Sequence, residues 1–318
     1  DYVGNTIDAL GVFYHEFISY SSGDGNSLGI VLTPPHLTEF MAELINIDKN
    51  SKVIDICCGS GTFLVTAMGT MFKQASAPDE IEYIRKNNLY GIEQDSDIHT
   101  LALANMIIRK DGKSNIVHGD CFNKDTIAKF SNLKDTNNQP VILNKGLLNP
   151  PYSQKDHCEL EFVEQELSLL CQGGLLAVVC PMSCAIGTKF KDVRERLMKN
   201  NTLKAVFSMP DEIFNGNGAS TNVCVMVWEA GYKHNPEIST FFGYYKDDGF
   251  VKRKKLGRVD VYGKWKEIKK EWLRLYREKE VKDGISAKHC VTHKDEWLCE
   301  AYMKTDYSKL TEEDFQKT

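Results

Sequence analysis

The sequence predicts a doubly wound α/β fold with a mostly parallel sheet of seven strands. Three observations lead to this fold class. Strand-like and helix-like segments alternate over roughly the first 230 residues, turn residues bound each segment, and the strand-like segments are continuous apolar runs. Continuous apolar runs, as opposed to alternating ones, are typical of parallel strands that helices cover on both faces.

The elements follow in order from these runs. Strands are expected at residues 52–58, 88–94, 115–120, 141–149, 174–182, 203–209 and 222–230. Helices with apolar periodicity are expected between them at residues 62–72, 97–110, 160–171 and 191–200. The chain therefore predicts a Rossmann-like core.

Two further segments flank this core. Residues 1–45 are expected to form an N-terminal helical segment, with a helix at residues 5–20 and a Thr-Pro-Pro motif before a second helix. Residues 46–234 form the predicted core, and residues 235–318 form a C-terminal extension with one strand and a long basic helix. Residue 1 is Asp, and we expect the 318 residues to be an excerpt of a longer chain.

Charge and composition exclude some functions. A net charge of −5 argues against a chain that coats nucleic acid through positive charge alone. Between residues 251 and 282, however, thirteen Lys and Arg residues face five acids. This stretch is either a solvated helix face or a surface for phosphates or a partner subunit. No apolar run is long enough for a membrane span and no secretion signal is present, so we expect a cytoplasmic protein.

The ten cysteines do not form a regular framework. Most lie inside apolar runs, which is typical of reduced and buried thiols. His289, Cys290, His293 and Cys299 are close in sequence but lack the paired C-x-x-C spacing of zinc sites. We therefore predict no metal site.

The first strand ends in an acid and a glycine turn, "DICCGSGT". Glycines at Gly59 and Gly61 let a backbone approach a ligand closely. The dinucleotide fingerprint needs a third glycine where this chain has Leu64. The carboxylate of Asp55 beside the turn would repel a pyrophosphate and attract an ammonium group. A cofactor with a positively charged amino-acid end fits better than NAD, and S-adenosylmethionine is the candidate.

The next two strands also end in acids. Glu93 ends the second strand and is placed to accept hydrogen bonds from ribose hydroxyls; we prefer it to Asp95, which lies beyond the strand end. Asp120 follows the third strand and is placed to accept from an adenine amino group, with Cys121 and Phe122 flanking the ring. Three acidic strand ends in order predict a nucleoside-containing cofactor.

The fourth strand ends in "NPPY". Two prolines stop a strand and make a stiff turn, but they do not explain Asn149 or Tyr152. With this motif, "LTPPHLTEFM", "DICCGSG" and "GIEQD", the chain resembles the N6-adenine DNA methyltransferases, in particular the modification (M) subunits of type I restriction-modification systems. Matches to "MPDEIFNGNGASTNVCVMVWE" and "DEWLCEAYMKTDYSKL" extend the resemblance over nearly the whole chain.

The resemblance implies a set of site residues. The catalytic motif would be Asn149, Pro150, Pro151 and Tyr152. The residues that would bind S-adenosyl-L-methionine are Thr33, Pro34, Asp55, Cys57, Gly59, Ser60, Gly61, Thr62, Glu93, Asp120 and Cys121. The implied partners are double-stranded DNA with a flipped adenine, a specificity (S) subunit and a restriction (R) subunit. Without the S subunit we expect cofactor binding but poor methylation of specific DNA.

The implied chemistry explains the two unassigned residues. The side-chain oxygen of Asn149 and the carbonyl of Pro150 would accept hydrogen bonds from the adenine amine, and Tyr152 would stack on the flipped ring. Three alternatives stay open at this point. They are methylation of a glutamine amide or of RNA, a cofactor-binding subunit without catalysis, and a dinucleotide oxidoreductase, which Leu64 disfavours.

Overall fold

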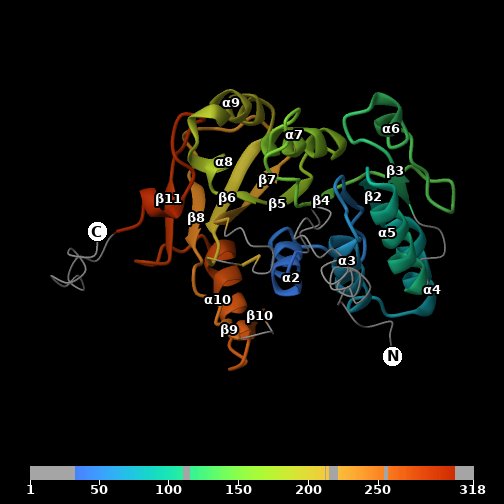
Figure 1. The fold of residues 1–318 in the computed structure, drawn as a ribbon, viewed down its shortest axis with the longest axis horizontal. Helices are drawn as coiled ribbons and strands as arrows, with labels where there is room; N and C mark the ends of the chain where they lie inside the picture. Colours follow the sequence, from blue (N-terminus) through green and yellow to red (C-terminus); the bar gives the residue numbers. More distant parts are fainter. Residues whose placement is uncertain (1–32, 110–114, 212, 215–220, 254–256, 305–318) are drawn as a thin grey trace, which may run out of the picture.

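A computed structural model of the chain describes residues 33–109, 115–211, 213–214, 221–253 and 257–304. The helix expected at residues 5–20 lies outside this part (Figure 1). In the described residues no helix is long and apolar enough to cross a membrane.

A sheet of nine strands runs through the described part of the chain, in the order β11-β8-β6-β7-β5-β4-β1-β2-β3. Its strands are β1 Val53–Asp55, β2 Leu89–Glu93, β3 Ile116–His118, β4 Lys145–Leu148, β5 Leu175–Pro181, β6 Thr202–Ser208, β7 Val223–Glu229, β8 Thr240–Tyr244 and β11 Ser286–His289. β7 is antiparallel to β5 and β6, β11 is antiparallel to β8, and the other pairs are parallel. The predicted fold class is confirmed, and the predicted strand number of seven is corrected to nine.

The two added strands come from the C-terminal extension. β8 pairs parallel with β6, and β11 then pairs with β8, where Ala287 lies opposite Phe242. One strand was expected in this extension, but an apolar run alone does not tell which neighbour it pairs with. The sheet therefore continues past the boundary expected between residues 234 and 235, and the division into domains stays a prediction.

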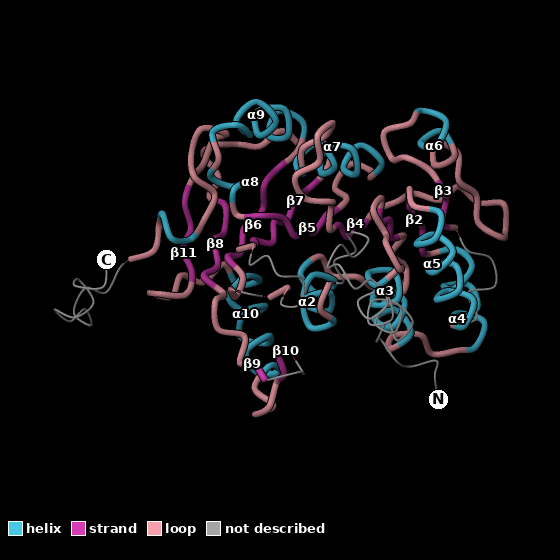
Figure 2. Tube along the Cα trace, viewed as in Figure 1, coloured by secondary structure: helices cyan, strands magenta, loops and turns pink. Residues whose placement is uncertain are grey.

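Helices cover both faces of the sheet (Figure 2). They are α2 Pro35–Leu44, α3 Thr62–Phe72, α4 Pro78–Asn87, α5 Ser96–Ile108, α6 Lys124–Ala128, α7 Glu159–Leu169, α8 Ser183–Ile186, α9 Lys191–Asn200 and α10 Trp265–Glu278, with 3-10 turns η2 Thr188–Phe190 and η3 Cys299–Ala301. One apolar cluster joins α2, α3 and α10 to the sheet, and a second joins α7, α8 and α9 to the opposite face. This layering is the doubly wound arrangement.

The order of the strands fixes where a site can form. From β1 the chain proceeds to β2 and β3 on one side, and it returns to β4 and β5 on the other. Ile54 lies opposite Tyr90 of β2 and opposite Gly146 of β4. The carboxyl ends of β1 and β4 therefore diverge at a switch point, where ligands bind in open α/β sheets.

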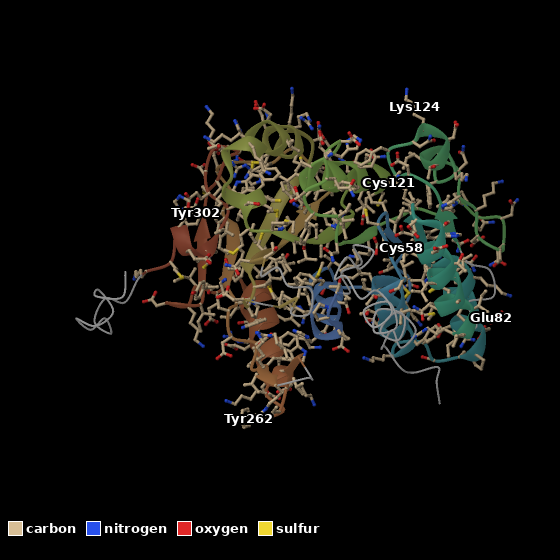
Figure 3. The ribbon with its side chains drawn as sticks, viewed as in Figure 1. Cys58, Glu82, Cys121, Lys124, Tyr262 and Tyr302 are labelled. Atoms are coloured by element: carbon tan, nitrogen blue, oxygen red, sulfur yellow. The ribbon has the colours of Figure 1, made fainter. Side chains whose placement is uncertain are left out.

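Several residues of the basic stretch that the structure describes are engaged within the protein. Helix α10 buries Trp265, Trp272, Leu273 and Leu275. Its Lys269 pairs with Glu43 of α2 at 2.5 Å, and Arg274 pairs with three neighbouring acids. Beside it, β9 Val251–Arg253 and β10 Gly257–Val259 pair antiparallel. Helix α10 and these two strands project from the rest of the protein, and Tyr262 lies at the outer end of this part, far from Cys58 and Cys121 (Figure 3). The amphipathic helix thus braces α2.

Candidate active site

The glycine turn after β1 has the geometry that only glycine adopts readily. Gly59 and Gly61 have φ values of 54° and 88°, in the left-handed region. The N–H of Gly61 donates to the carbonyl of Cys58 at 2.8 Å, and Gly61 is the N-cap of α3. The helix begins at Thr62, as the sequence predicts.

Glu93 connects the second strand end to this turn. One carboxylate oxygen accepts from the N–H of Gly59 at 2.9 Å, and the other accepts from the N–H of Asp95 at 2.8 Å. Asp95 instead caps α5, because its side chain accepts from the N–H groups of Asp97 and Ile98. Glu93 is therefore anchored at the turn while Asp95 organises the next helix.

The third strand end presents its backbone and a thiol. Asp120 is exposed, and its side chain accepts from the N–H of Phe122 at 2.9 Å. Cys121 is buried, and its carbonyl accepts from the side chain of Gln165 on α7. The Phe122 ring stacks on His157 with centroids 3.7 Å apart. An aromatic wall thus continues from the third strand end to the segment before α7.

The Thr-Pro-Pro and Asn-Pro-Pro-Tyr motifs meet in space. The Nδ2 of Asn149 donates to the hydroxyl oxygen of Thr33 at 3.1 Å. Thr33 is buried and comes directly before Pro34 and helix α2. With Nδ2 directed at Thr33, the Oδ1 of Asn149 is left as the acceptor of this amide. Sequence reasoning placed Thr33 at the cofactor and missed this contact, which spans 116 residues.

Tyr152 is half-buried, with its hydroxyl directed inward. The hydroxyl oxygen is buried and has no hydrogen-bond partner among the described residues. Burial is the main cause that raises the pKa of this phenol well above its usual value, and the thiols of Cys180, Cys224 and Cys184 raise it further. The phenol is therefore neutral, and the residue is suited to apolar contact through its ring.

Asp55 lies beneath the turn. Its side chain is buried, with 1% exposed, and Oδ1 accepts from the N–H of Cys57 at 3.0 Å. Its Oδ2 has no hydrogen-bond partner in the described part of the chain. Burial raises the pKa of this carboxyl to about 8, and the charge of Glu93 acts in the same direction. Asp55 therefore holds the backbone of the turn through its hydrogen bond with the N–H of Cys57.

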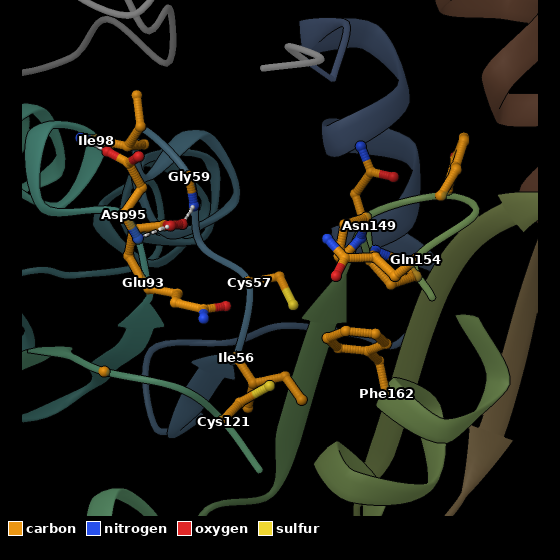
Figure 4. Close-up of a pocket in the computed structure, with 15 residues that line it drawn as sticks. Ile56, Cys57, Gly59, Glu93, Asp95, Ile98, Cys121, Asn149, Gln154 and Phe162 are labelled. Carbon is orange, nitrogen blue, oxygen red and sulfur yellow. Dashed lines mark hydrogen bonds between the residues drawn. The ribbon is translucent and has the colours of Figure 1, made fainter. Parts of the chain in front are cut away.

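A pocket of about 710 Å³ lies at the switch point (Figure 4). Glu93, Asp95, Gly59 and Ile98 lie on one side of it, and Asn149, Gln154 and Phe162 lie on the other. Of the predicted site residues, those that line it are Cys57, Gly59, Glu93, Cys121, Asn149, Pro150, Pro151 and Tyr152. The predicted cofactor turn and the predicted catalytic motif therefore share one cavity.

The other predicted residues lie around this cavity and do not line it. They are Thr33, Pro34, Asp55, Ser60, Gly61, Thr62 and Asp120. The lining residues that sequence reasoning missed are Ile56, Gln94, Ile98, Gly119, Gln154 and Phe162, and Asp95, which was weighed against Glu93 and set aside, also lines the pocket. Most of them stand close to a motif residue in the sequence, so their position beside a motif could have indicated that they line the site. The direct contacts predicted for each residue stay predictions.

The N-6 DNA Methylase family model matches residues 5–242. The chain belongs to the N-6 DNA methylase family. The chain is also 38% identical, over 98% of its length, to the "Type II restriction enzyme and methyltransferase RM.BcgI" of Heyndrickxia coagulans. It is 26% identical, over 80% of its length, to the "Type I restriction enzyme MpnII methylase subunit" of Mycoplasma pneumoniae. Family membership agrees with the resemblance that the three strand-end motifs and the Thr-Pro-Pro segment indicate.

Solved structures of two methyltransferase subunits share the fold of this chain. The type I methyltransferase subunit from Streptococcus thermophilus superposes with a TM-score of 0.67 at 16% identity, over 93% of this chain and 64% of that one. The EcoKI M protein gives 0.61 at 18% identity, over 85% and 66%. This chain spans about half the length of the curated relatives it matches, 48% of the Heyndrickxia protein and 50% of the Mycoplasma one.

Proposed function

We propose that this chain is the catalytic part of an N6-adenine DNA methyltransferase of a restriction-modification system, with S-adenosylmethionine as methyl donor. The observation that carries the proposal is the shared pocket, where the glycine turn and Glu93 face the Asn149 motif. Membership of the N-6 DNA methylase family supports the same reaction. It disfavours methylation of a glutamine amide or of RNA.

The residues at the pocket suit S-adenosylmethionine. A volume of about 710 Å³ is within the range of cofactor sites. The turn backbone at Gly59 and the carboxylate of Glu93 would hold polar parts of the cofactor, and Ile98, Cys121 and Phe162 would enclose its apolar ones. When bound, this cofactor supplies a methyl group on a positively charged sulfur, which is a strong electrophile.

The Asn149 motif activates the nucleophile. The N6 lone pair of adenine is delocalised into the ring, so it attacks poorly until the amine becomes more tetrahedral. The Oδ1 of Asn149 and the carbonyl of Pro150 would accept from the two amino hydrogens and favour that geometry. Thr33 fixes the amide orientation through its hydrogen bond at 3.1 Å. No ionised base is needed before attack, because the proton leaves after the new N–C bond has formed.

The adenine must leave the duplex to reach this pocket. Tyr152 would stack on the flipped ring, an interaction worth roughly 1 to 3 kcal/mol per base. Its hydroxyl end is buried in the protein, and the ring is the part of the side chain that would make this contact. The prolines on its N-terminal side hold the turn rigid.

The partners belong to the proposal as well. The type I relatives are named methylase subunits, whereas the 38% identical relative is named a restriction enzyme and methyltransferase together. A restriction activity on the same polypeptide is therefore an alternative to a separate R subunit. We infer that a specificity subunit supplies sequence recognition, and that the protein acts on host DNA in the cytoplasm.

The first test removes the two side chains that act on the base. In the full-length enzyme with its partners, Asn149→Ala should lower the single-turnover rate at least about 100-fold. Tyr152→Ala should lower it by the loss of stacking, up to about 100-fold. Both variants should keep the affinity for S-adenosylmethionine in calorimetry, because the turn and Glu93 are unchanged. Asn200→Ala, an exposed amide on α9, is the matched control.

Wild-type rates in the Asn149→Ala enzyme would contradict the assignment of the catalytic motif. A loss of cofactor affinity equal to the loss of rate would place Asn149 in the cofactor site instead of the base site.

A further inference from the structure

Helix α7 carries a carboxyl group into the interior of the molecule. Glu166 is fully buried, with 0% of its surface exposed, on the face of α7 that packs on the sheet. Its neighbour Glu164 on the same helix instead pairs with Arg196 at the surface. A buried carboxyl is costly unless other groups compensate it, so its contacts indicate why it is there.

The Glu166 carboxyl lies between the end of β1 and the middle of β4. Oε2 accepts from the N–H of Ile56, the residue directly after β1, at 3.3 Å. On the β4 side it touches Gly146, where a Cβ atom would collide with Oε1 and would also meet Leu176 at 2.9 Å. The side chain therefore fills the gap at the switch point, and Gly146 provides the space for it.

Glu166 shares this interior with a second acid. Its Oε1 and the Oδ2 of Asp55 are both buried without a hydrogen-bond partner among the described residues. Burial is the main cause that raises the pKa of the Glu166 carboxyl, the Asp55 charge raises it further, and the N–H groups of Ile56 and Leu147 oppose the shift. The other titratable groups facing the pair are the carboxylate of Glu93 and the thiols of Cys57, Cys58 and Cys121.

We propose that Glu166 is a positioning residue for methyl transfer, because its carboxyl joins Ile56, at the start of the cofactor turn, to Gly146 of β4, the strand that leads into the Asn149 motif. Glu166 does not line the pocket, so it acts through these two segments and not on the substrates. The inference rests on the proposed function of the site. It adds a residue that no strand-end motif contains.

The separation between the two segments matters for the reaction. One segment would hold the methyl donor and the other would hold the acceptor amine, so a shift between β1 and β4 changes the distance of attack. Errors of about 1 Å in such a distance cost on the order of 100-fold in rate. A neutral acceptor at Glu166 is sufficient for this role, since its partner at Ile56 is an N–H donor.

The first experiment compares Glu166→Ala and Glu166→Gln in the full-length enzyme with its partners. Glu166→Ala should lower kcat by about 10- to 100-fold, with a smaller change in the affinity for S-adenosylmethionine. Glu166→Gln keeps an acceptor for Ile56 and should retain kcat near pH 7. At higher pH the wild type should lose activity more steeply than Glu166→Gln, because only the wild type ionises a second acid there. Glu164→Ala is the control on the same helix.

The second experiment uses the contact with Gly146. Gly146→Ala should displace the Glu166 carboxyl and lower kcat, whereas Gly146→Ala combined with Glu166→Ala should lose less than the product of the two single losses. Hydrogen exchange should be faster in peptides that cover residues 53–58 and 145–150 in Glu166→Ala, but not in Glu164→Ala. If Glu166→Ala does not fold, the kcat values of Glu166→Gln and Gly146→Ala still test whether Glu166 positions the two segments.

Three results would overturn the proposal: wild-type kcat and exchange in Glu166→Ala, multiplicative losses in the double variant, or Glu166→Gln as impaired as Glu166→Ala at every pH. Failure of the proposed function gives a different result, since the wild-type enzyme would then neither bind the cofactor nor methylate DNA. In that case the exchange of the two peptides alone decides whether Glu166 joins them.

Discussion

At the scale of the residue, Asp55 shows how burial changes the reading of a motif. In the sequence it is an acid beside a glycine turn, placed to attract an ammonium group. In the structure it is buried beneath that turn, one oxygen is bound to the N–H of Cys57, and its pKa is raised. A negative charge on Asp55 therefore destabilises the folded protein unless a cation compensates it.

The raised pKa of Asp55 predicts a pH dependence of stability. An unfolded Asp releases its proton near pH 4, whereas folded Asp55 keeps it until about pH 8. The contribution of this protonated carboxyl to the free energy of unfolding is complete below about pH 4. It is lost as the pH rises toward 8, by up to about 1.4 kcal/mol per pH unit. Without cofactor, the Tm of the wild type should fall relative to that of Asp55→Asn between pH 5 and 8. Parallel Tm curves in differential scanning calorimetry would contradict this.

At the scale of the element, the C-terminal extension supports the segment that carries Thr33. His36 of α2 stacks on Phe250 with centroids 4.0 Å apart, and its Nε2 lies 3.4 Å from the buried Asp248 carboxylate. Asp248 also pairs with Arg258 of β10. This cluster ties the paired strands β9 and β10 to the start of α2, one turn from the hydrogen bond between Thr33 and Asn149.

Removing the charge of Asp248 should therefore destabilise the protein. Asp248→Asn leaves Arg258 without its buried partner, and breaking such a pair typically costs about 3 kcal/mol or more. Asp247→Asn, an exposed neighbour, should cost less than about 1 kcal/mol. Urea unfolding of the two variants measures both values. Equal midpoints for the two variants would show that the cluster contributes nothing to the stability of the fold.

The sequence was sufficient for the elements of the core and insufficient for their long-range contacts. Most strands from β1 to β7 were predictable because both their faces are buried, whereas β3, at the edge of the sheet, is exposed at His118. Helix α4 was missed because Ile84 and Asn87 are its only residues classed as buried, which leaves little apolar periodicity. Glu166 was missed because acids in a helical pattern usually face solvent. The contact between Thr33 and Asn149 depends on the packing of α2, which no local pattern contains.

At the scale of the whole molecule, the described chain is built around one large sheet with a site at its switch point. The cofactor turn and the Asn149 motif come from strands on opposite sides of that point, so the fold itself brings the two halves of the site together. The curated relatives are about twice as long as this chain. We expect sequence recognition to come from outside these residues, from the rest of the protein or from a partner subunit.

The central claim is methylation of adenine at N6, and long-read sequencing tests it most directly. The whole gene with its neighbouring subunits would be expressed in a host that lacks it, beside an Asn149→Ala allele and an empty vector. We predict N6-methyladenine at one recognition sequence with the wild-type gene, and its absence with the other two. An unmethylated genome, the same adenine mark with Asn149→Ala, or methylation of cytosine in place of adenine would contradict the account.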